Sequence, residues 1–299
     1  MNKNLKKTKI IATLGPATSS KETMIQMIQA GVDVFRINFS HADYELVKRN
    51  VDIIREINKE YGYSVSILGD LQGPKLRVGV VKEGSFLNPG DVLTFTNEKM
   101  EGDSTKVYMT YEKFPQDVKV GERILIDDGK LVLEVIETNE VDTVRAKTIQ
   151  GGPLSSKKGV NLPNTNVSLP ALTEKDIEDA NFMLDNEFDW IALSFVRHAQ
   201  DIIDLKDLMA KHPTNKTKTP IIAKIEKPEG VKNIDQILME CDCLMVARGD
   251  LGVEVPMEQV PVIQKNLVNK ARLYAKPVII ATQMMETMIT SLTPTRAEV

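Results

Sequence analysis

The sequence is poor in the residues and segments that mark several special classes of protein. Only two cysteines occur in 299 residues, and Cys241 and Cys243 have no histidine or further cysteine near them in the sequence. We expect both to be small buried side chains rather than parts of a disulfide or a metal site. No apolar stretch is long enough to span a membrane, and the basic start MNKNLKKTK precedes too short an apolar run for a secretory signal.

The charge and the apolar content narrow the class further. The net charge of −4 argues against a nucleic-acid-binding surface. Hydrophobic residues make up 42% of the chain, which is enough for a sizeable core in one large domain or two. These properties predict a cytoplasmic protein whose partners are neither nucleic acid nor a membrane.

Strand and helix patterns alternate along most of the chain. Two capping-box patterns, Ser19-x-x-Glu22 and Thr173-x-x-Asp176, predict helix starts. Short apolar runs typical of buried strands occur at residues 10–14, 34–40, 65–68, 190–195, 220–225, 244–247 and 277–281. Strands that alternate with helices predict an α/β fold with a helix-covered parallel sheet. Seven such strands predict a (β/α)8 TIM-type barrel that is incomplete at its C-terminal end, because the eighth strand is absent.

One long stretch breaks this alternation. Between about Gln72 and Pro163 there is no convincing helix, and the runs VLTF, RILI, LVLEVI and TVRAKTI are separated by turn sequences such as NPGD and DDGK. They predict a small antiparallel β-barrel, inserted after the third barrel strand, at the catalytic face of such barrels, where it can act as a lid. The expected domains are residues 1–71 and 166–299 for the barrel and 72–165 for the lid.

Charged residues stand where apolar runs end. The run PIIAKIE ends in Lys224-x-Glu226, and because side chains alternate across a strand, these two share one face. The run CLMVARGD ends at Asp250. Two carboxylates and an ammonium are suited to holding a hard divalent cation beside a phosphate or carboxylate ligand. A buried structural salt bridge is the alternative interpretation.

A second polar face lies in the segment DVFRINFSH, where Arg36, Asn38 and Ser40 alternate with apolar residues. A guanidinium binds a phosphate through two hydrogen bonds, and the amide and hydroxyl offer oxygens to a cation. An exposed polar face of an edge strand is the alternative, but a closed barrel has no edge strands. The pattern therefore favours a ligand site.

Further candidates lie around the third strand and the lid. Asp70 ends the strand, and Lys75 and Arg77 stand at the lid entrance. His41 could touch a nucleotide. Lys158, near the end of the lid, could close over phosphates, although a surface charge is the default interpretation there.

The sixth and seventh strands add a last group. Gly249 lets the backbone approach a ligand, and the amides of Gly249 and Asp250 could bind a carboxylate. Thr282 stands at the end of the seventh strand. The methionines within residues 284–288 are more typical of a core than of a cofactor site.

Taken together, these segments resemble the pyruvate kinase family. The resemblance runs in chain order through KIIATLGPAT, FRINFSH, DLQGPKLR, GGPLSSKKGVNLP, LSFVR, IIAKIEKPEG, MVARGDLGVEVP and IIATQMMETM. That family transfers the phosphoryl group of phosphoenolpyruvate to ADP, giving pyruvate and ATP in the last step of glycolysis. The resemblance implies a Mg²⁺-dependent kinase with phosphoenolpyruvate and ADP as substrates, and a homo-oligomer, a tetramer, for the full-length protein.

The resemblance also assigns roles to residues of this chain. Glu226 and Asp250 would bind Mg²⁺, Lys224 would neutralise the transferring phosphoryl group, and Arg36 would hold the phosphate. Thr282 lies where the family places a residue involved in protonating the enolpyruvate. The substrate-binding residues would be Arg36, Lys224, Gly249, Asp250 and Thr282. The nucleotide-binding residues would be Arg77, His41 and Lys158. The monovalent-cation site would be formed by Asn38, Ser40, Asp70 and the carbonyl of Leu71.

Two positions depart from the potassium-requiring members of the family, which have Thr where Leu71 stands and Glu where Lys75 stands. An ammonium five residues after Asp70 could supply the charge that potassium carries, so we expect K⁺ not to be required. The alternative is that Lys75 points into solvent. The family pattern also continues beyond Val299 with an eighth strand and a C-terminal domain, so we expect residues 1–299 alone to be inactive.

Two other functions stay open. A Mg²⁺-dependent 2-oxo-acid lyase or aldolase also uses Glu and Asp at strand ends, although the lid, Lys224 and FRINFSH argue against it. A catalytically inactive truncated relative would instead bind a partner or a regulator. Because every catalytic position of the family is intact, we expect the parent protein to be an enzyme.

Overall fold

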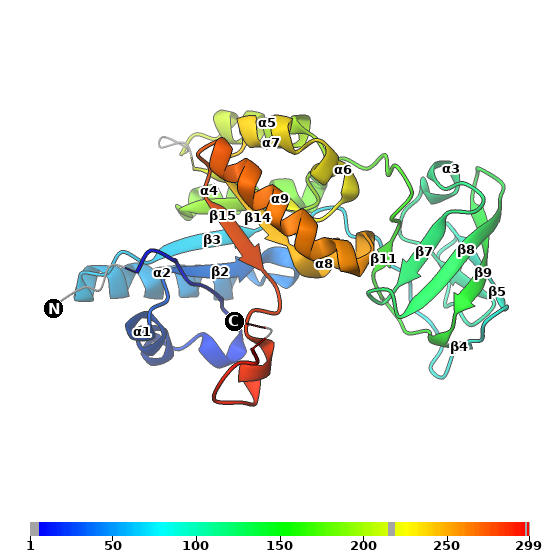
Figure 1. The fold of residues 1–299 in the computed structure, drawn as a ribbon, viewed down its shortest axis with the longest axis horizontal. Helices are drawn as coiled ribbons and strands as arrows, with labels where there is room; N and C mark the ends of the chain where they lie inside the picture. Colours follow the sequence, from blue (N-terminus) through cyan, green and yellow to red (C-terminus); the bar gives the residue numbers. More distant parts are fainter. Residues whose placement is uncertain (1–5, 215–218, 297, 299) are drawn as a thin grey trace.

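The structure is a computed structural model that describes residues 6–214, 219–296 and 298, apart from the side chain of His41. Figure 1 shows an α/β region and, to its right, a smaller β-rich region. We call the α/β region the barrel region and the β-rich region the lid.

The barrel region is built on one parallel sheet of seven strands in the order β1-β2-β3-β12-β13-β14-β15. These strands are β1 Ile11–Thr13, β2 Val34–Asn38, β3 Ser66–Asp70, β12 Trp190–Leu193, β13 Ile221–Ile225, β14 Cys243–Ala247 and β15 Val278–Ala281. Each strand pairs in parallel with its neighbour in this order. The predicted fold class is confirmed: the sheet is the wall of a TIM-type barrel that lacks its eighth strand, and β1 and β15 are its two described edges.

Helices cover the outer face of this sheet (Figure 1). They are α1 Lys21–Ala30, α2 Tyr44–Tyr61, α4 Glu174–Asp185, α5 Ala199–Lys211, α6 Pro228–Lys232, α7 Ile234–Glu240, α8 Arg248–Glu254 and α9 Val260–Leu273. Short 3-10 turns are η1 Pro16–Thr18, η2 Phe39–His41, η3 Met257–Gln259 and η4 Glu286–Ile289. None of the described helices combines the length and hydropathy that a membrane crossing requires.

The helix starts follow from side-chain caps. The hydroxyl of Thr173 accepts a bond from the amide of Asp176 at 3.1 Å, and the carboxylate of Asp176 accepts one from the amide of Thr173 at 2.9 Å. This is the predicted capping box of α4. The predicted start of α1 was one residue too early, because Ser20 is the cap and accepts from the amide of Thr23 at 3.2 Å.

Apolar burial on both faces holds the barrel wall in place. Every residue of β13 and β14 is buried, as expected for parallel strands packed on both sides. The outer face packs against the helices in one large core. The inner face forms a smaller cluster of Leu68, Ala192, Ile222, Cys243 and Met245. Both cysteines are free and buried, as predicted.

The lid has a hydrophobic core of its own, drawn from residues between Leu76 and Leu162. This separate core supports our proposal that residues 72–165 are a domain inserted into the barrel, whose two parts would be residues 1–71 and 166–299. Its strands are β4 Phe86–Leu87, β5 Val92–Thr96, β6 Lys106–Tyr108, β7 Arg123–Ile126, β8 Leu131–Thr138, β9 Thr143–Gln150, β10 Gly152–Pro153 and β11 Val160–Asn161.

The lid sheet corrects one prediction. Six strands follow the order β11-β7-β8-β9-β5-β6, and β4 pairs with β10 apart from them. The sheet is mixed rather than purely antiparallel, because β5 and β6 pair in parallel after residues 97–105 carry the chain back along the sheet. A one-turn helix, α3 Phe114–Asp117, also lies where no helix was expected.

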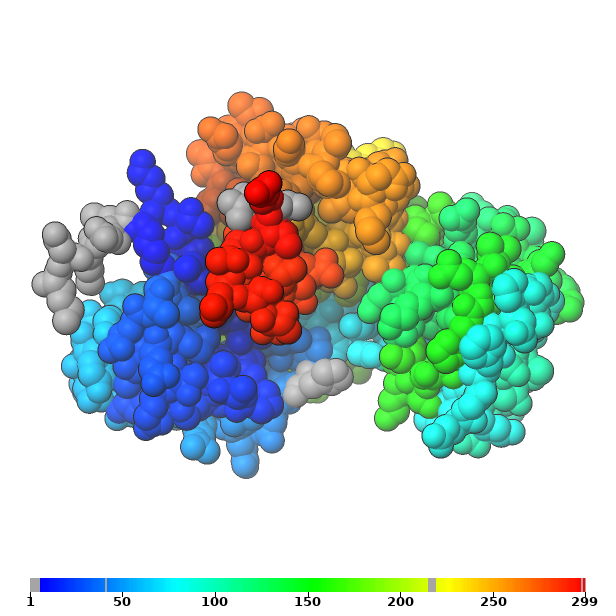
Figure 2. Space-filling model, turned by 60° about the horizontal axis from the view of Figure 1, so that its bottom comes forward, coloured from blue at the N-terminus to red at the C-terminus, as the bar shows by residue number. Residues whose placement is uncertain are grey.

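The end of the chain gives a second correction. The methionines predicted to lie in a core are exposed: Met284 at 55%, Met285 at 37% and Met288 at 46%. The chain leaves β15 in a short turn, η4, instead of a helix packed on the sheet. Figure 2 shows this segment, coloured red, on the surface of the molecule.

Candidate active site

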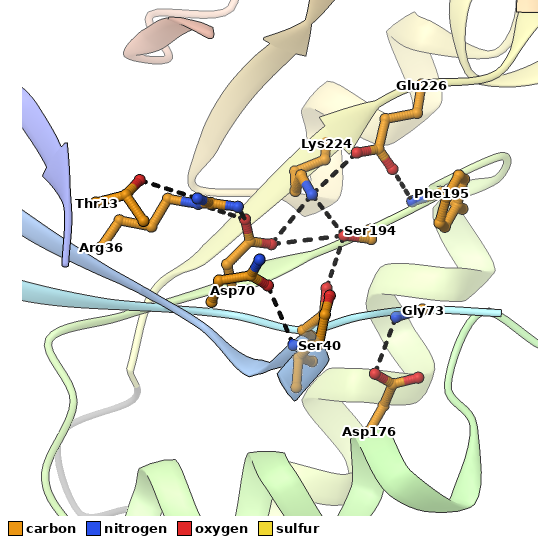
Figure 3. A network of polar contacts seen from close by, with 12 residues as sticks. Thr13, Arg36, Ser40, Asp70, Gly73, Asp176, Ser194, Phe195, Lys224 and Glu226 are labelled. Carbon is orange, nitrogen blue, oxygen red and sulfur yellow. Dashed lines mark hydrogen bonds and ion pairs between the residues drawn. The ribbon is translucent and has the colours of Figure 1, made fainter. Parts of the chain in front are cut away.

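A cluster of charged side chains lies toward the carboxyl ends of β2, β3 and β13 (Figure 3). At its centre, the ammonium of Lys224 contacts three acceptors: Glu226 Oε1 at 2.9 Å, Asp70 Oδ1 at 3.1 Å and Ser194 Oγ at 2.6 Å. The contact to Ser194 is a hydrogen bond, and the contacts to Asp70 and Glu226 are ion pairs. The structure therefore brings the predicted Lys224 and Glu226 together and adds Asp70 from β3.

Asp70 also binds the guanidinium of Arg36. The Nε atom of Arg36 donates to Asp70 Oδ2 at 2.6 Å, Nη2 lies 2.6 Å from the same oxygen, and Nη1 donates to Thr13 Oγ1 at 2.9 Å. Asp70 is only 1% exposed, and its carboxylate contacts two cationic side chains, Arg36 and Lys224. The four ionised groups of Arg36, Lys224, Asp70 and Glu226 thus balance one another.

Burial and neighbouring charges together shift the pKa values of Glu226 and Lys224. Burial raises the pKa of Glu226, the charge of Lys224 opposes that shift, and the nearby charge of Asp250 adds to it. Burial by itself would lower the pKa of Lys224, but the charges of Glu226 and Asp70 outweigh it and hold that pKa above its usual range. Lys224 is therefore a permanent cation at the centre of the cluster.

Sequence reasoning missed Ser194 and Phe195, which follow β12. Ser194 donates to the carbonyl of Leu71 at 2.7 Å while accepting from Lys224, and the amide of Phe195 donates to Glu226 Oε2 at 2.6 Å. Both residues lie in the LSFVR segment, directly after an apolar run. The rule that singled out the other site residues would have found Ser194 too.

The expected position of Asp250 needs a correction. Strand β14 ends at Ala247, and α8 begins at Arg248, so Asp250 lies in the first turn of a helix rather than at a strand end. The guanidinium of Arg248, the first residue of this helix, donates to the carbonyls of Ala281, at 3.2 Å, and Thr282. Asp250 is exposed and lines both the cavity beside Thr282 and the cleft that Lys75 and Phe195 line.

Gly249 and Thr282 lie against each other beside Asp250. A Cβ placed on Gly249 would lie 2.8 Å from Cγ2 of Thr282, so no larger residue fits there. The backbone of Thr282 has a φ of +75°, which is uncommon for a residue other than glycine and typical of functional sites. All three residues line one cavity of about 760 Å³.

The residues of the expected monovalent-cation site are neighbours on β2 and β3. Asn38 is in register with Asp70, and Leu71 follows Asp70 directly. The side-chain oxygen of Asn38 accepts from the amide of Ser40 at 3.1 Å. Asp70 Oδ2 faces Arg36, Asp70 Oδ1 faces Lys224, and the Leu71 carbonyl accepts from Ser194, so with Asn38 Oδ1 four oxygens of this set already have partners.

The lid residues stand farther out. Lys158 pairs with Asp127 of the lid at 2.9 Å, and Arg77 donates to the carbonyl of Lys157 at 3.0 Å. Lys75 is exposed and lines a narrow cleft between lid and barrel. The side chain of His41 lies outside the described residues.

The carboxylates suit a metal ion only with help from other ligands. Among residues 6–214, 219–296 and 298, no three Asp, Glu, His or Cys side chains stand close enough together to hold a metal by themselves. Glu226 and Asp250 supply two hard oxygen donors. Because burial and Asp250 both disfavour the charged form of Glu226, a divalent cation there would relieve an existing electrostatic penalty, and substrate oxygens could complete its coordination.

Comparisons with known proteins agree with the geometry. The family model described as "Pyruvate kinase, barrel domain" matches residues 5–299. A pyruvate kinase of Mycobacterium intracellulare is 46% identical over 291 residues, covering 97% of this chain and 61% of that protein. Pyruvate kinase 2 of a Synechocystis species is 49% identical over 301 residues, covering 98% of this chain and 50% of that protein. A pyruvate kinase of Geobacillus stearothermophilus is 45% identical over 298 residues, with the same two coverages. The chain thus spans 50% to 61% of the length of these relatives.

Proposed function

The chain belongs to the pyruvate kinase family, and from that premise we propose that the native protein transfers the phosphoryl group of phosphoenolpyruvate to ADP, giving pyruvate and ATP. The observation that carries this proposal is the buried cluster of Lys224, Arg36, Asp70 and Glu226 with Asp250 beside it. In this reaction an oxygen of the ADP β-phosphate bonds to phosphorus, the bond from phosphorus to the enol oxygen breaks, and the enolate takes a proton at its terminal carbon. Such a transfer relies on positioning and positive charge rather than on covalent help from the protein.

Lys224 and Arg36 supply the positive charge for the phosphoryl group in this proposal. Arg36 is partly exposed and can turn one edge of its guanidinium, which carries N–H donors, toward a phosphate while still contacting Asp70. The ammonium of Lys224 already faces Asp70, Glu226 and Ser194, and a phosphoryl oxygen would join or replace one of these partners. A charge that acts mainly on the transition state raises turnover more than it tightens substrate binding.

Mg²⁺ fits this cluster on grounds of charge. The cations and carboxylates of Arg36, Lys224, Asp70 and Glu226 balance before any substrate is present. An anionic substrate therefore needs a further cation, and we propose that Glu226 and Asp250 hold it. When bound, Mg²⁺ would supply positive charge to the phosphoryl and enolate oxygens.

We propose that potassium is not required. The expected site of Asn38, Ser40, Asp70 and the Leu71 carbonyl is already charge-compensated at Asp70 and hydrogen-bonded at Leu71. Lys75 lines the lid cleft, and its four-carbon side chain gives it the reach to turn inward when the lid moves. Two cations close together would repel each other, which disfavours an added potassium ion.

The open side of the site would receive the rest of the substrate. The backbone amides of Gly249 and Asp250, in the first turn of α8, would bind the carboxylate beside the side chain of Thr282, which packs against Gly249. Thr282, packed against Gly249, would take part in protonating the enolpyruvate. Both residues face the cavity that Asp250 lines.

The lid would form part of the binding site for ADP. Arg77 and Lys158 lie on the lid, and His41 follows β2 and Ser40; we propose that all three contact ADP. Closure would bring the lid residues inward and exclude the water that could otherwise accept the phosphoryl group. We also propose that the native protein is a cytoplasmic homo-oligomer, a tetramer.

A coupled assay tests the proposed function and separates it from its alternatives. Pyruvate formation is followed in the native protein with phosphoenolpyruvate and Mg²⁺, with and without ADP. We expect pyruvate only when ADP is present, in equal amount with ATP. With a 2-oxo acid supplied in place of phosphoenolpyruvate and ADP, a lyase or aldolase would form product, whereas an inactive relative would form none with either substrate.

A further inference from the structure

The hydroxyl of Ser194 has two fixed partners at the centre of the site. Ser194 is 1% exposed. Its oxygen accepts from Lys224 Nζ at 2.6 Å, and its single proton goes to the carbonyl of Leu71 at 2.7 Å, since Asp70 Oδ1 lies farther away at 3.5 Å. A hydroxyl has one donor and two acceptor lone pairs. With its proton committed to Leu71, its lone pairs face Lys224.

The two residues that follow hold the neighbouring groups. Phe195 adopts a left-handed backbone with a φ of +54°, an energetically costly conformation for a bulky residue and one concentrated at functional sites. This turn aims the amide of Phe195 at Glu226 Oε2, 2.6 Å away, and the amide of Val196 donates to the carbonyl of Lys224 at 3.3 Å. Three consecutive residues after β12 therefore hydrogen-bond to Lys224 or Glu226, and Figure 3 shows the first two of them, Ser194 and Phe195.

Close packing fixes Ser194 in this position. A Cβ placed on Gly73 would lie 3.1 Å from Cβ of Ser194 and 2.8 Å from a ring carbon of Phe195. Gly73 is itself held, because its amide donates to Asp176 Oδ1 at 3.0 Å. The start of the lid connection thus covers Ser194 and leaves its side chain little room to turn.

We propose that Ser194 is a positioning residue for Lys224, an inference that rests on the proposed phosphoryl transfer. In that transfer the phosphoryl group approaches an ammonium that already faces three oxygens. It repels the carboxylates of Asp70 and Glu226 but not the neutral hydroxyl. Ser194 therefore keeps its bond to Lys224 through the transfer and sets where the ammonium stands.

Two substitutions in the native protein separate positioning from packing. Ser194→Cys keeps the volume but replaces the hydroxyl by a poor hydrogen-bonding group, whereas Ser194→Thr keeps the hydroxyl and adds a methyl group. Loss of one hydrogen bond to a charged group corresponds to about a 10- to 100-fold fall in kcat. We expect this fall for Ser194→Cys, with the KM for phosphoenolpyruvate within about threefold of the wild type, as for a contact that acts in the transition state. Ser194→Thr keeps the hydrogen bond to Lys224, so its kcat is expected to stay above that of Ser194→Cys, with any loss set by the added methyl group.

The reverse order, with Ser194→Cys as active as the wild type and Ser194→Thr impaired, would overturn the proposal, because it is the order that packing alone predicts. Ser156→Ala is the control. Its hydroxyl bridges the amide and carbonyl of Val81 in the lid at 2.9 and 3.0 Å, and its loss should leave kcat unchanged.

A crystal structure of Ser194→Ala gives a readout that needs no activity. We expect the Lys224 ammonium to shift from its present position between Asp70 and Glu226 or to lose defined density. An unmoved ammonium would overturn the positioning role even if the substitutions above destabilise the protein. If the wild type forms no pyruvate from phosphoenolpyruvate and ADP, the proposed function fails, while this crystal structure still decides whether Ser194 positions Lys224.

Discussion

Replacing Lys224 by methionine tests the electrostatic account of the site most severely. Methionine keeps much of the side-chain volume and removes the charge. The charges of Asp70 and Glu226 then lose the cation that lies 3.1 Å and 2.9 Å from them. Asp70 keeps Arg36, and Glu226 keeps the amide of Phe195.

The expected magnitudes follow from those contacts. Removing a preorganised charge or donor from a developing transition state costs on the order of a hundredfold or more in kcat. We expect at least that loss for Lys224→Met, with a much smaller change in the KM for phosphoenolpyruvate. Breaking a buried ion pair also lowers the free energy of unfolding by about 3–5 kcal/mol, so stability is to be measured by denaturant unfolding alongside the kinetics.

Lys227→Met is a matched control for this experiment. Lys227 pairs with Glu254 at 2.6 Å, and its side chain is 12% exposed, against 11% for Lys224. Glu254 keeps the amide of Asn161 after the substitution, as Glu226 keeps that of Phe195. Both variants should lose comparable stability, but only Lys224→Met should lose turnover. An equal fall in kcat for the two variants, or an effect of Lys224→Met confined to KM, would refute the reasoning.

Three further predictions follow from the same site. Glu226→Gln and Asp250→Asn should each remove most turnover and raise the Mg²⁺ concentration needed for half-maximal activity; near-normal activity of both variants at limiting Mg²⁺ would show that the carboxylates do not hold the metal. The wild type should be as active in sodium or Tris buffer as with potassium chloride at matched ionic strength, and Lys75→Glu combined with Leu71→Thr should create a potassium requirement; many-fold activation of the wild type by potassium would contradict this. Residues 1–299 alone should be inactive and bind a hydrophobic dye, because β1 and β15 leave unpaired sheet edges beside exposed methionines; full activity with one sharp unfolding transition would show that the open edge is harmless.

Periodicity predicted the barrel wall well because its strands are buried on both faces. The run PIIAKIE lies within one residue of β13 at each end of the strand, and the alternation rule correctly placed Lys224 and Glu226 side by side. Parallel strands packed on two sides show up as short apolar runs, and polar residues at their ends stand out.

Other features depend on contacts between distant segments and left weaker signals. Asp250 was placed on a strand because nothing local marks the start of α8, which Arg248 stabilises by binding the end of β15. The parallel pairing of β5 and β6 depends on how the chain crosses the lid sheet, a matter of topology rather than of local pattern. The methionines after β15 have helical spacing, but no described element covers them.

Only some of the site residues could be recognised from the sequence. Arg36, Lys224 and Glu226 carry charges in apolar runs, and that is costly enough to be noticed. Ser194 is small and neutral; its place after an apolar run marks it as a candidate, but its contacts with Lys224 and Leu71 are seen only in three dimensions. The left-handed backbone of Phe195 could not be predicted from the sequence either, because this position is neither a glycine nor an asparagine.

Phosphorus NMR on the native protein measures the central claim directly. With phosphoenolpyruvate, ADP and Mg²⁺, the account predicts that the phosphoenolpyruvate signal falls while the γ-phosphate signal of ATP rises in equal amount, and that Lys224→Met slows this exchange on the order of a hundredfold or more. Release of inorganic phosphate without ATP, or transfer at the wild-type rate in Lys224→Met, would contradict it.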